Sequence, residues 1–453
     1  MNRIALVLPL ALLGLVACHP RGSTSQSKWA TATENELLDA VQSQAFKYFW
    51  DFAEPHSGLA RERYHPDGVY PLDDAHIVTT GGSGFGIMAL LVGIERGFIT
   101  RAEGMERLER IVSFLESADR FHGIWPHWLN GETGKTKPFS RKDDGGDLVE
   151  SSFLIQGLLC VRQYCDPEYP MESALAERID KLWREMDWNW HTQGTKDLFW
   201  HWSPNFGFEM NFALRGYNEV LITHILAAAS PTHPVSPEVY HHCWARGGAI
   251  EANDRFQGLD RVLDHYETND SPVGPLFWAH YSYLGLDPRG LKDRYGDFWE
   301  LNRNHALSHY RHCVENPNGF EGYGPDCWGL TSSYSPKNGT IGYASHRPDR
   351  DIGVITPTAA ISSIPYTPKE SLAAIRGFFV NYGDILVGPA GFYDAFRPHD
   401  SWIANRYLAI DQGPMIVMIE NYRTGLLWKL FMSCPEISSA LDTLGFERRV
   451  ASP

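Results

Sequence analysis

The sequence predicts an all-helical protein of the (α/α)6-barrel class, in which helical pairs form a ring around a cleft. Apolar residues recur at helical spacing in a long series of segments, whereas the alternation typical of strands is scarce. Long loops rich in Gly, Pro and Trp separate these segments, at residues 121–139, 191–211, 316–350 and 389–402. Loops of this length in a compact domain usually carry function, so we expect them to shape the cleft. A helical protein of two domains would give a similar pattern.

The helical periodicity marks ten segments of the chain. They span residues 34–52, 83–97, 101–118, 147–165, 172–188, 211–229, 236–245, 292–313, 368–382 and 411–422. After residue 34 the sequence has no repeat of fixed period and no linker rich in Pro and Ser. We therefore predict a single domain over residues 34–453.

The first residues have the features of a bacterial lipoprotein signal. Arg3 gives a positive start, and the apolar run of residues 4–16 is too short to remain as a spanning helix. Ala17 and then Cys18 follow, as in the box where the signal is cut and the cysteine takes lipid. We predict that residues 1–18 are this signal and that lipid is attached to Cys18. An ordinary signal peptide with an incidental cysteine is the alternative.

Residues 19–33 are rich in Ser, Thr and Gln, which predicts a flexible tether between the lipid and the folded domain. An aspartate after the cysteine would favour retention at an inner membrane, but His19 stands there. The expected location is therefore the cell envelope, at the outer membrane or the periplasmic face. The lipid would be the only membrane contact, and we expect a monomer.

The composition excludes one class of partner and favours another. The chain has 40 Lys and Arg against 55 Asp and Glu and no basic stripe, so we do not expect nucleic acid as a partner. Aromatic residues make up 13%, with 15 Trp, many of them beside Gly, Pro, Asn and His. Flat sugar faces pack on aromatic rings, so this favours a carbohydrate cleft, although buried aromatics are also ordinary core. Six cysteines follow Cys18 without a CxxC pair, and they can be free or bridged.

A run of carboxylates precedes the helix predicted from residue 147. Asp143, Asp147 and Glu150 can converge there, because two glycines allow a tight entry into the helix. Glycoside hydrolysis needs one protonated and one ionised carboxyl group, and crowded like charges raise the pKa of at least one of them. The alternative is a capping box, in which Asp147 binds free N–H groups and Glu150 reaches back.

A second run, residues 199–211, interleaves aromatic and polar residues and leads into a predicted helix. Trp200 and Trp202 suit a sugar platform or, alternatively, core filling. Glu219 has apolar neighbours within that helix, which would disfavour its ionised form as a catalytic acid requires. The alternative for Glu219 is an ion pair with Arg215 on the helix surface.

Weaker candidates complete the predicted site. Trp125 and His127 would add a rim platform, Tyr323 and Trp328 a further loop of the cleft, while Asp411 is expected to cap a helix. The histidines show no ligand spacing such as HExxH, so neither a metal nor another cofactor is expected. The glycine run at residues 79–86 lacks the ending of a phosphate loop, and no esterase elbow is present.

Several segments resemble the bacterial glucoamylase-like family that contains endo-β-1,2-glucanases, glycoside hydrolase family 144. They are DGGDLVE at residues 144–150, WHWSPN at 200–205, GYNE at 216–219, PLFWAHYS at 275–282, LGLDPRG at 284–290, YGPDCWGL at 323–330 and AIDQGP at 409–414. The resemblance extends over nearly everything after residue 34.

The resemblance implies an (α/α)6 barrel, inverting cleavage of β-1,2-glucosidic bonds and no required metal. It implies essential acidic residues at Asp143, Asp147, Glu150 and Glu219. We expect a β-linked glucan as the partner, with Trp125, His127, Trp200, Trp202, Arg215, Asn218, Tyr323 and Trp328 as substrate contacts. A related domain performs transglycosylation in cyclic β-1,2-glucan synthases, so that reaction is one alternative. A glucan-binding lipoprotein without catalysis is the other, although binding alone needs no crowded carboxylates.

Overall fold

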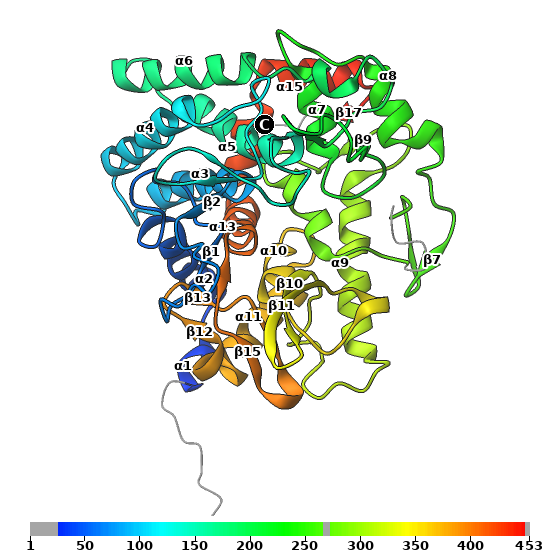
Figure 1. The fold of residues 1–453 in the computed structure, drawn as a ribbon. Coiled ribbons are helices and arrows are strands. Elements are labelled where there is room, and N and C mark those ends of the chain that lie inside the picture. The colour runs from blue at the N-terminus through cyan, green and yellow to red at the C-terminus, as the bar shows by residue number, and fades with distance from the viewer. Residues whose placement is uncertain (1–25, 266–271, 449–453) are drawn as a thin grey trace, which may run out of the picture.

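Helices make up 47% of the structure, a computed structural model that describes residues 26–265 and 272–448. They form two layers around a common centre (Figure 1). The prediction for Cys18 and its signal lies outside the described residues. In the described part of the chain, no helix combines the length and the apolar character that crossing a membrane would require.

The inner layer consists of helices whose side chains are buried almost all round, as expected for helices that lie between other helices. These are α3 (Thr80–Glu95), α5 (Leu148–Tyr164), α7 (Leu221–Ala229), α10 (Pro357–Ser362) and α13 (Ala409–Arg423). The outer helices bury one side each. They are α2 (Glu34–Trp50), α4 (Arg101–Ser117), α6 (Pro170–Arg184), α9 (Phe298–Glu315), α11 (Pro368–Asn381), α14 (Leu426–Met432) and α15 (Pro435–Thr443).

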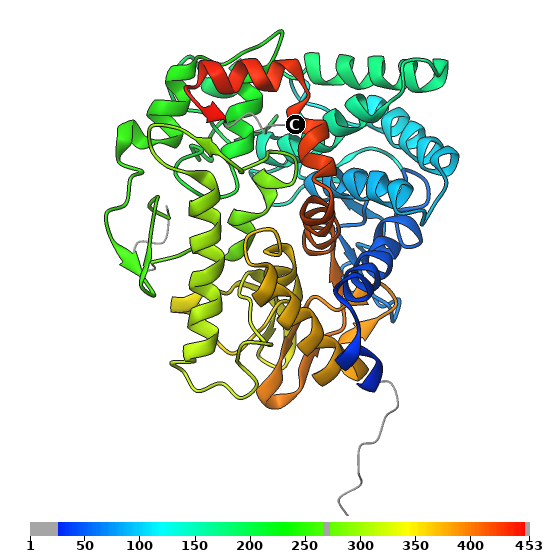
Figure 2. The same cartoon turned by 180° about the vertical axis from the view of Figure 1, so that it is seen from behind.

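The inner elements close into a ring. Helix α13 contacts α3, α3 contacts α5, α5 contacts α7, and α7 contacts the 3-10 turn η5 (Tyr281–Tyr283). The preceding turn, η4 (Leu276–Ala279), is joined to the end of α10, because Tyr366 Oη donates to Ala279 O at 3.0 Å. Helix α10 contacts α13, which also lies against α2 and so joins the two ends of the chain (Figure 2). The prediction of an (α/α)6 barrel is confirmed.

The strands are short, and their hairpins and pairs belong to the long loops. All pairs are antiparallel. They are β1 (Arg63–Tyr64) with β16 (Tyr407–Leu408), β2 (Ile77–Thr79) with β3 (Trp128–Asn130), β3 with β4 (Thr136–Lys137), β5 (Gly146–Asp147) with β6 (His201–Trp202), β7 (Arg255–Phe256) with β8 (Leu259–Asp260), β9 (Leu291–Lys292) with β17 (Glu447–Arg448), β10 (Ser332–Lys337) with β11 (Thr340–Ser345), β12 (Val387–Gly388) with β13 (Gly391–Phe392), and β14 (Ala395–Arg397) with β15 (Trp402–Ala404).

The glycine run at residues 79–86 forms the first turns of α3, where it permits close packing on α5. A Cβ on Gly84 would lie 2.1 Å from the Phe153 carbonyl oxygen, and one on Gly157 would lie 2.3 Å from the Gly84 carbonyl oxygen. Backbone therefore meets backbone between the two helices that carry much of the active site.

We expect Gly84→Ala to lower the free energy of unfolding by at least about 2 kcal/mol, because the added methyl group forces the two backbones apart. Chemical denaturation of purified protein measures this. The matched control is Gly383→Ala at the start of α12 (Gly383–Leu386), where the nearest atom lies 4.0 Å from an added Cβ. Equal stability of the two variants would contradict the close packing.

Three sequence predictions need correction. The folded part begins before residue 34, because α1 (Gln26–Thr31) packs on α11 through stacked rings of Trp29 and Phe379, 4.3 Å apart. The helix predicted from residue 211 begins only at Leu221, and the one predicted from residue 292 begins at Phe298, where Asp297 caps it. Of the two states that the sequence left open for the six cysteines of the described residues, the structure has the free one for all.

Candidate active site

A cleft of about 760 Å³ opens among the loops that connect the inner helices. Its apolar floor is formed by Phe153, Phe277 and Tyr281. One wall carries a cluster of acidic and histidine side chains, and another is formed in part by the hairpin β10–β11. The polar and aromatic residues of both walls are Glu62, Arg63, Thr79, His127, Trp128, Phe139, Ser140, Asp143, Glu150, Trp200, His201, Phe212, Glu219, Tyr334 and Tyr343.

The start of α5 organises the acidic wall. Strand β5 pairs with β6, so Asp147 stands opposite His201. Asp147 is the N-cap of α5, and its Oδ1 accepts hydrogen bonds from the backbone N–H groups of Val149 and Glu150. The cap that the sequence predicts is thus present. Glu150 does not reach back to complete a capping box, because its Oε2 accepts a hydrogen bond from Gly81 N at 2.9 Å.

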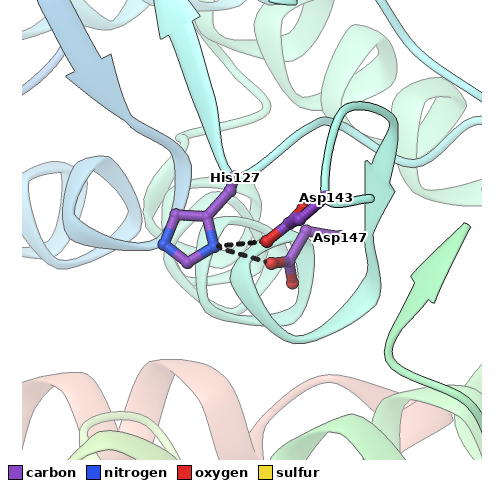
Figure 3. Close-up of side chains that lie close together, drawn as sticks. All are labelled: His127, Asp143 and Asp147. Carbon is purple, nitrogen blue, oxygen red and sulfur yellow. Dashed lines mark hydrogen bonds and ion pairs between the residues drawn. The ribbon is translucent and has the colours of Figure 1, made fainter. Parts of the chain in front are cut away.

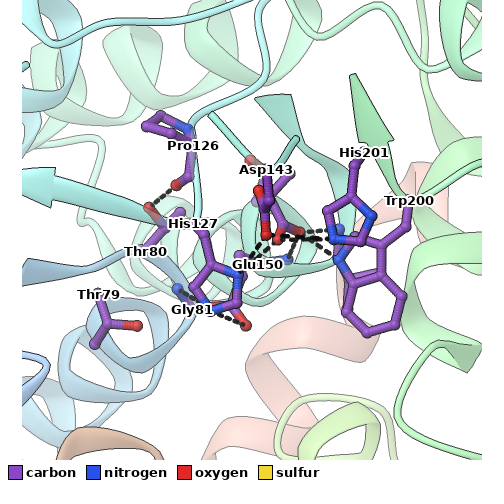
Figure 4. A network of polar contacts seen from close by, with 12 residues as sticks. Thr79, Thr80, Gly81, Pro126, His127, Asp143, Glu150, Trp200 and His201 are labelled. Atoms are coloured by element: carbon purple, nitrogen blue, oxygen red, sulfur yellow. Dashed lines mark hydrogen bonds and ion pairs between the residues drawn. The ribbon is translucent and has the colours of Figure 1, made fainter. Parts of the chain in front are cut away.

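Asp147 also anchors two cleft side chains. Trp200 Nε1 donates to its Oδ1 at 2.7 Å, and His127 Nδ1 lies 2.8 Å from its Oδ2 (Figure 4). The carboxylate is fully buried, and both its oxygens are engaged. Asp147 therefore holds the site together from beneath and does not line the cleft.

His127 lies against Asp143 and Asp147 (Figure 3), and its other ring nitrogen is near Glu150. Its Nδ1 lies 3.6 Å from Asp143 Oδ2, and its Nε2 lies 4.0 Å from Glu150 Oε1. His201 Nε2 is 3.5 Å from the same Asp143 oxygen. The other oxygen of Asp143, Oδ1, has no hydrogen-bond partner within the described residues.

The titratable groups of this wall have pKa values that are shifted in different directions. Burial lowers the pKa of His127, but Glu150, Asp147 and Asp143 raise it, and the result is about 9. Burial raises the pKa of Asp147, yet the hydrogen bond and charge of His127 outweigh this and hold that pKa below its ordinary value. Burial and the Asp147 charge raise the pKa of Asp143 to about 7, while burial alone is the main cause of a raised Glu150 pKa and a lowered His201 pKa.

This arrangement suits proton transfer near neutral pH, since Asp143 exchanges its proton in that range beside a permanent ion pair of His127 and Asp147. His127, Asp143 and Asp147 also place one possible metal-ligand atom each within 4.8 Å of one another. Their separation along the chain explains why no ligand motif was visible. Asp147 already accepts four hydrogen bonds, from Val149, Glu150, Trp200 and His127, which favours a proton network.

Glu219 lines the same cleft, as its proposed role requires. It lies in the turn before α7 and not inside a helix, and Ser282 Oγ donates to its backbone oxygen at 2.6 Å. The alternative of an i,i+4 pair on a helix surface does not apply, because residues 215–219 are not helical. Arg215 Nη2 lies 3.0 Å from Asp197 Oδ2.

An acidic residue that the sequence pattern does not reveal also lines the cleft. Glu62 forms an ion pair there with Arg63, the first residue of β1. Behind the cleft, Asp411 and Asp394 are buried beside each other, so burial and mutual repulsion disfavour a charge on both carboxyl groups. Burial raises the pKa of Asp394 to about 6 and that of Asp411 as well. The expectation that Asp411 caps α13 is wrong, because the N-cap there is Leu408.

Two tryptophans predicted as sugar platforms belong to the core. Trp125 and Trp328 are both 0% exposed, so neither ring can touch a ligand. Trp125 Nε1 donates to Leu115 O, and Trp328 Nε1 donates to Glu370 O. Their local sequences gave no sign of this, because a buried Trp and a sugar-binding Trp have the same neighbours in the chain.

Four further predicted contacts do not line the cleft. Trp202 follows His201 on β6 and so points to the other face of the strand. Tyr323 Oη donates to Asp351 Oδ1, and the Asn218 side chain bonds the backbone of its own turn. Arg215 pairs with Asp197. Of the predicted substrate contacts, His127 and Trp200 line the cleft.

A closed ring of helical pairs around an aromatic cleft lined by several carboxylates places the chain in the class of glycoside hydrolases with an α/α toroid. Residues 211–435 match the Glycoamylase family model, whose description is putative glucoamylase. An endo-β-1,2-glucanase from Chitinophaga pinensis, solved with sophorotriose and glucose, is 57% identical with a TM-score of 0.90 over 92% of this chain and 99% of its own. The chain belongs to this glucoamylase-like family, glycoside hydrolase family 144, as its sequence predicts.

Two other relatives extend the comparison. The exo β-1,2-glucooligosaccharide sophorohydrolase (non-reducing end) of Parabacteroides distasonis is 44% identical over 430 residues, which are 91% of this chain. The match spans 58% of that relative's length. The endo-β-1,2-glucanase of Talaromyces funiculosus, solved with sophorose, shares the fold with a TM-score of 0.65 at 12% identity, covering 92% of this chain and 89% of its own.

Proposed function

We propose that the protein hydrolyses β-1,2-glucosidic bonds of β-1,2-glucan and releases sophorose or short oligosaccharides. The observation that carries this proposal is the cleft itself, where Glu219 and the Asp143–Glu150 cluster share one aromatic-floored cavity. The substrate class rests on the relatives from Chitinophaga pinensis and Parabacteroides distasonis, which are named for action on β-1,2-linked glucans.

The roles follow from position and charge. Glu219 serves as the general acid that protonates the leaving oxygen, as its place in the cleft allows. Asp143 serves as the base that activates water, because it lines the cleft and its pKa lies near 7. Asp147 and His127 position Asp143 and set its charge. Attack by water opposite the leaving group inverts the anomeric centre, with no covalent intermediate.

The base role makes a prediction about pH. Activity falls as the pH drops through about 7, where Asp143 becomes protonated and can no longer accept a proton from water. The His127 cation lowers the pKa of Asp143, so its removal in His127→Gln must raise that pKa. We expect the acid limb of the kcat/KM profile to move up by about one unit or more in this variant.

His201→Gln is the matched control for this pH shift. His201 lies as close to Asp143 as His127 does, 3.5 Å against 3.6 Å. Burial lowers the pKa of His201, so near neutral pH it carries no charge, and its loss should leave the acid limb in place. Equal shifts in both variants, or a shift to lower pH in His127→Gln, would show that His127 does not act through its charge.

A panel of glucans tests the proposed function directly. Purified protein is incubated with β-1,2-, β-1,3-, β-1,4- and α-1,4-glucans, and new reducing ends are counted. We expect new reducing ends from β-1,2-glucan only, and EDTA should not reduce their number. Chromatography identifies the products, and proton NMR shows which anomer is formed first. Tight binding without new reducing ends would favour a binding lipoprotein, and longer products than the substrate would indicate transglycosylation.

We also propose that the protein is exported and anchored to the cell envelope by lipid at Cys18, facing the periplasm or the outer membrane. The signal-like residues 1–18 support this. Incorporation of a labelled fatty acid in cells tests it, with Cys18→Ala as the variant that should lose both label and membrane association. Label retained in Cys18→Ala would refute the anchor.

A further inference from the structure

A cluster of aromatic side chains lies on the surface beside the cleft. Trp190 is 41% exposed, although it is a large apolar residue. The His122 ring stacks on it with centroids 3.9 Å apart and an interplanar angle of 15°. Trp202 meets both of these rings edge-on, and Phe208 lies 6.4 Å from Trp190. We call these four residues the Trp190 cluster.

The Trp190 cluster is held rigidly. His122 has a positive φ of 53° in the tight turn between Phe121 and Ile124, a strained backbone for a residue other than glycine. Its carbonyl oxygen accepts a hydrogen bond from Asp187 N, and Asp187 Oδ1 accepts one from Trp190 N. The turn and the segment with Trp190 are therefore fixed to each other.

Gly123 explains how the two segments can lie so close. A Cβ at this position would stand 2.0 Å from the Glu185 carbonyl oxygen, so only glycine fits. The two segments therefore hold the Trp190 indole in one orientation while leaving it exposed to solvent. Such a fixed, exposed ring is preorganised for binding, because little side-chain entropy is lost when a ligand stacks on it.

The Trp190 cluster is continuous with the cleft. Residues 203–212 form one loop, in which Phe208 contacts Trp190 while Met210 and Phe212 line the cleft. Strand β6 connects the same two regions, with His201 on the cleft side and Trp202 in the Trp190 cluster. A polymer that leaves the cleft over this loop would reach Trp190.

We propose that the Trp190 cluster is a second sugar-binding site, which stacks pyranose rings of the same neutral glucan beyond the catalytic cleft. The cluster residues carry no carboxylate or ammonium group, as suits an uncharged ligand, and Asn189, which precedes Trp190, is exposed and can bond hydroxyl groups. The inference rests on the proposed function for the identity of the polymer. The Trp190 cluster would retain long glucan chains and would take no part in bond cleavage.

The test compares long β-1,2-glucan with a short β-1,2-glucooligosaccharide that the cleft alone can hold. Trp190→Ala should raise KM for the long chain about three- to tenfold, the range expected from loss of one stacking contact. Its kcat, and both constants for the short substrate, should stay unchanged. Trp190→Phe should restore part of the affinity, and Tyr169→Ala, another exposed aromatic residue at the start of α6, should have no effect.

The outcomes separate this inference from the proposed function. If the wild-type protein releases no reducing ends from β-1,2-glucan, the proposed function fails. The second site can still be tested, by comparing the migration of wild type and Trp190→Ala in native gels that contain the glucan. Equal KM values of wild type and Trp190→Ala on the long chain would overturn the second site. A changed oligomeric state of Trp190→Ala in gel filtration would also overturn it, because the cluster would then be a contact between copies.

Discussion

Glu219→Gln should lower kcat on β-1,2-glucan at least about a hundredfold. Glutamine keeps the size of the side chain and its hydrogen bonding but cannot deliver a proton to the leaving oxygen. The fold should be unaffected, because the bond from Ser282 to residue 219 uses the backbone oxygen, which the substitution retains. Initial rates at saturating substrate, together with a thermal unfolding curve, measure both expectations.

A substrate with an activated leaving group distinguishes an acid from a binding residue. A nitrophenyl β-sophoroside needs little protonation of its leaving oxygen, so Glu219→Gln should lose much less activity on it than on the polysaccharide. Glu209→Gln is the control, since Glu209 is exposed and pairs with Lys142 outside the cleft. Near-normal turnover of Glu219→Gln on glucan would place the acid at Asp143 or Glu150, which also line the cleft.

The architecture could be predicted because its signals are local. Helical periodicity located most of the inner and outer helices, since it depends on residues within the helix itself, but it missed α10, α14 and α15. The exceptions have tertiary causes. Residues 211–220 show helical spacing, but Glu219 lies in a turn whose backbone is held by Ser282 from a distant segment. Trp29 is kept in the fold by Phe379, which no pattern around residue 29 reveals.

The two walls of the site differ in how far the sequence could predict them. Asp143, Asp147 and Glu150 are close in the chain, so their convergence at one helix start was visible from spacing. Arg63 was not, because it enters the cleft through a strand pair with Leu408. Asp411 looked like a helix cap because its neighbour Asp394 lies earlier in the chain. Only the folded loop between them brings the two side chains together.

The sugar contacts were harder to predict than the acids. His127 and Trp200 proved to line the cleft, whereas the Trp202 ring packs with Phe121, His122 and Trp190. Side-chain direction alternates along β6, so the adjacent residues His201 and Trp202 face opposite sides once β6 pairs with β5. Without that pairing the direction of each ring was undetermined.

Asp143→Asn should lower kcat at least about a hundredfold, because the water loses the base that accepts its proton. Asparagine preserves the shape of the side chain, and Asp147, which caps α5, is untouched, so the fold should persist. The acid limb of the remaining pH profile should no longer reflect a group of pKa about 7. Activity assays across pH on long β-1,2-glucan test both statements.

Asp144→Asn is the matched control for the base, one residue further along the same loop. The Asp144 Oδ2 accepts a hydrogen bond from Asn205 Nδ2, and this side chain does not line the cleft. Its replacement should leave kcat within about threefold of the wild type, since no proton passes through it. If Asp143→Asn keeps its kcat and its acid limb near pH 7, the base must be sought at Glu150, which faces the same cleft beside His127. Loss of activity in Asp144→Asn to the same degree would instead show that the loop's shape, and not the Asp143 carboxylate, governs turnover.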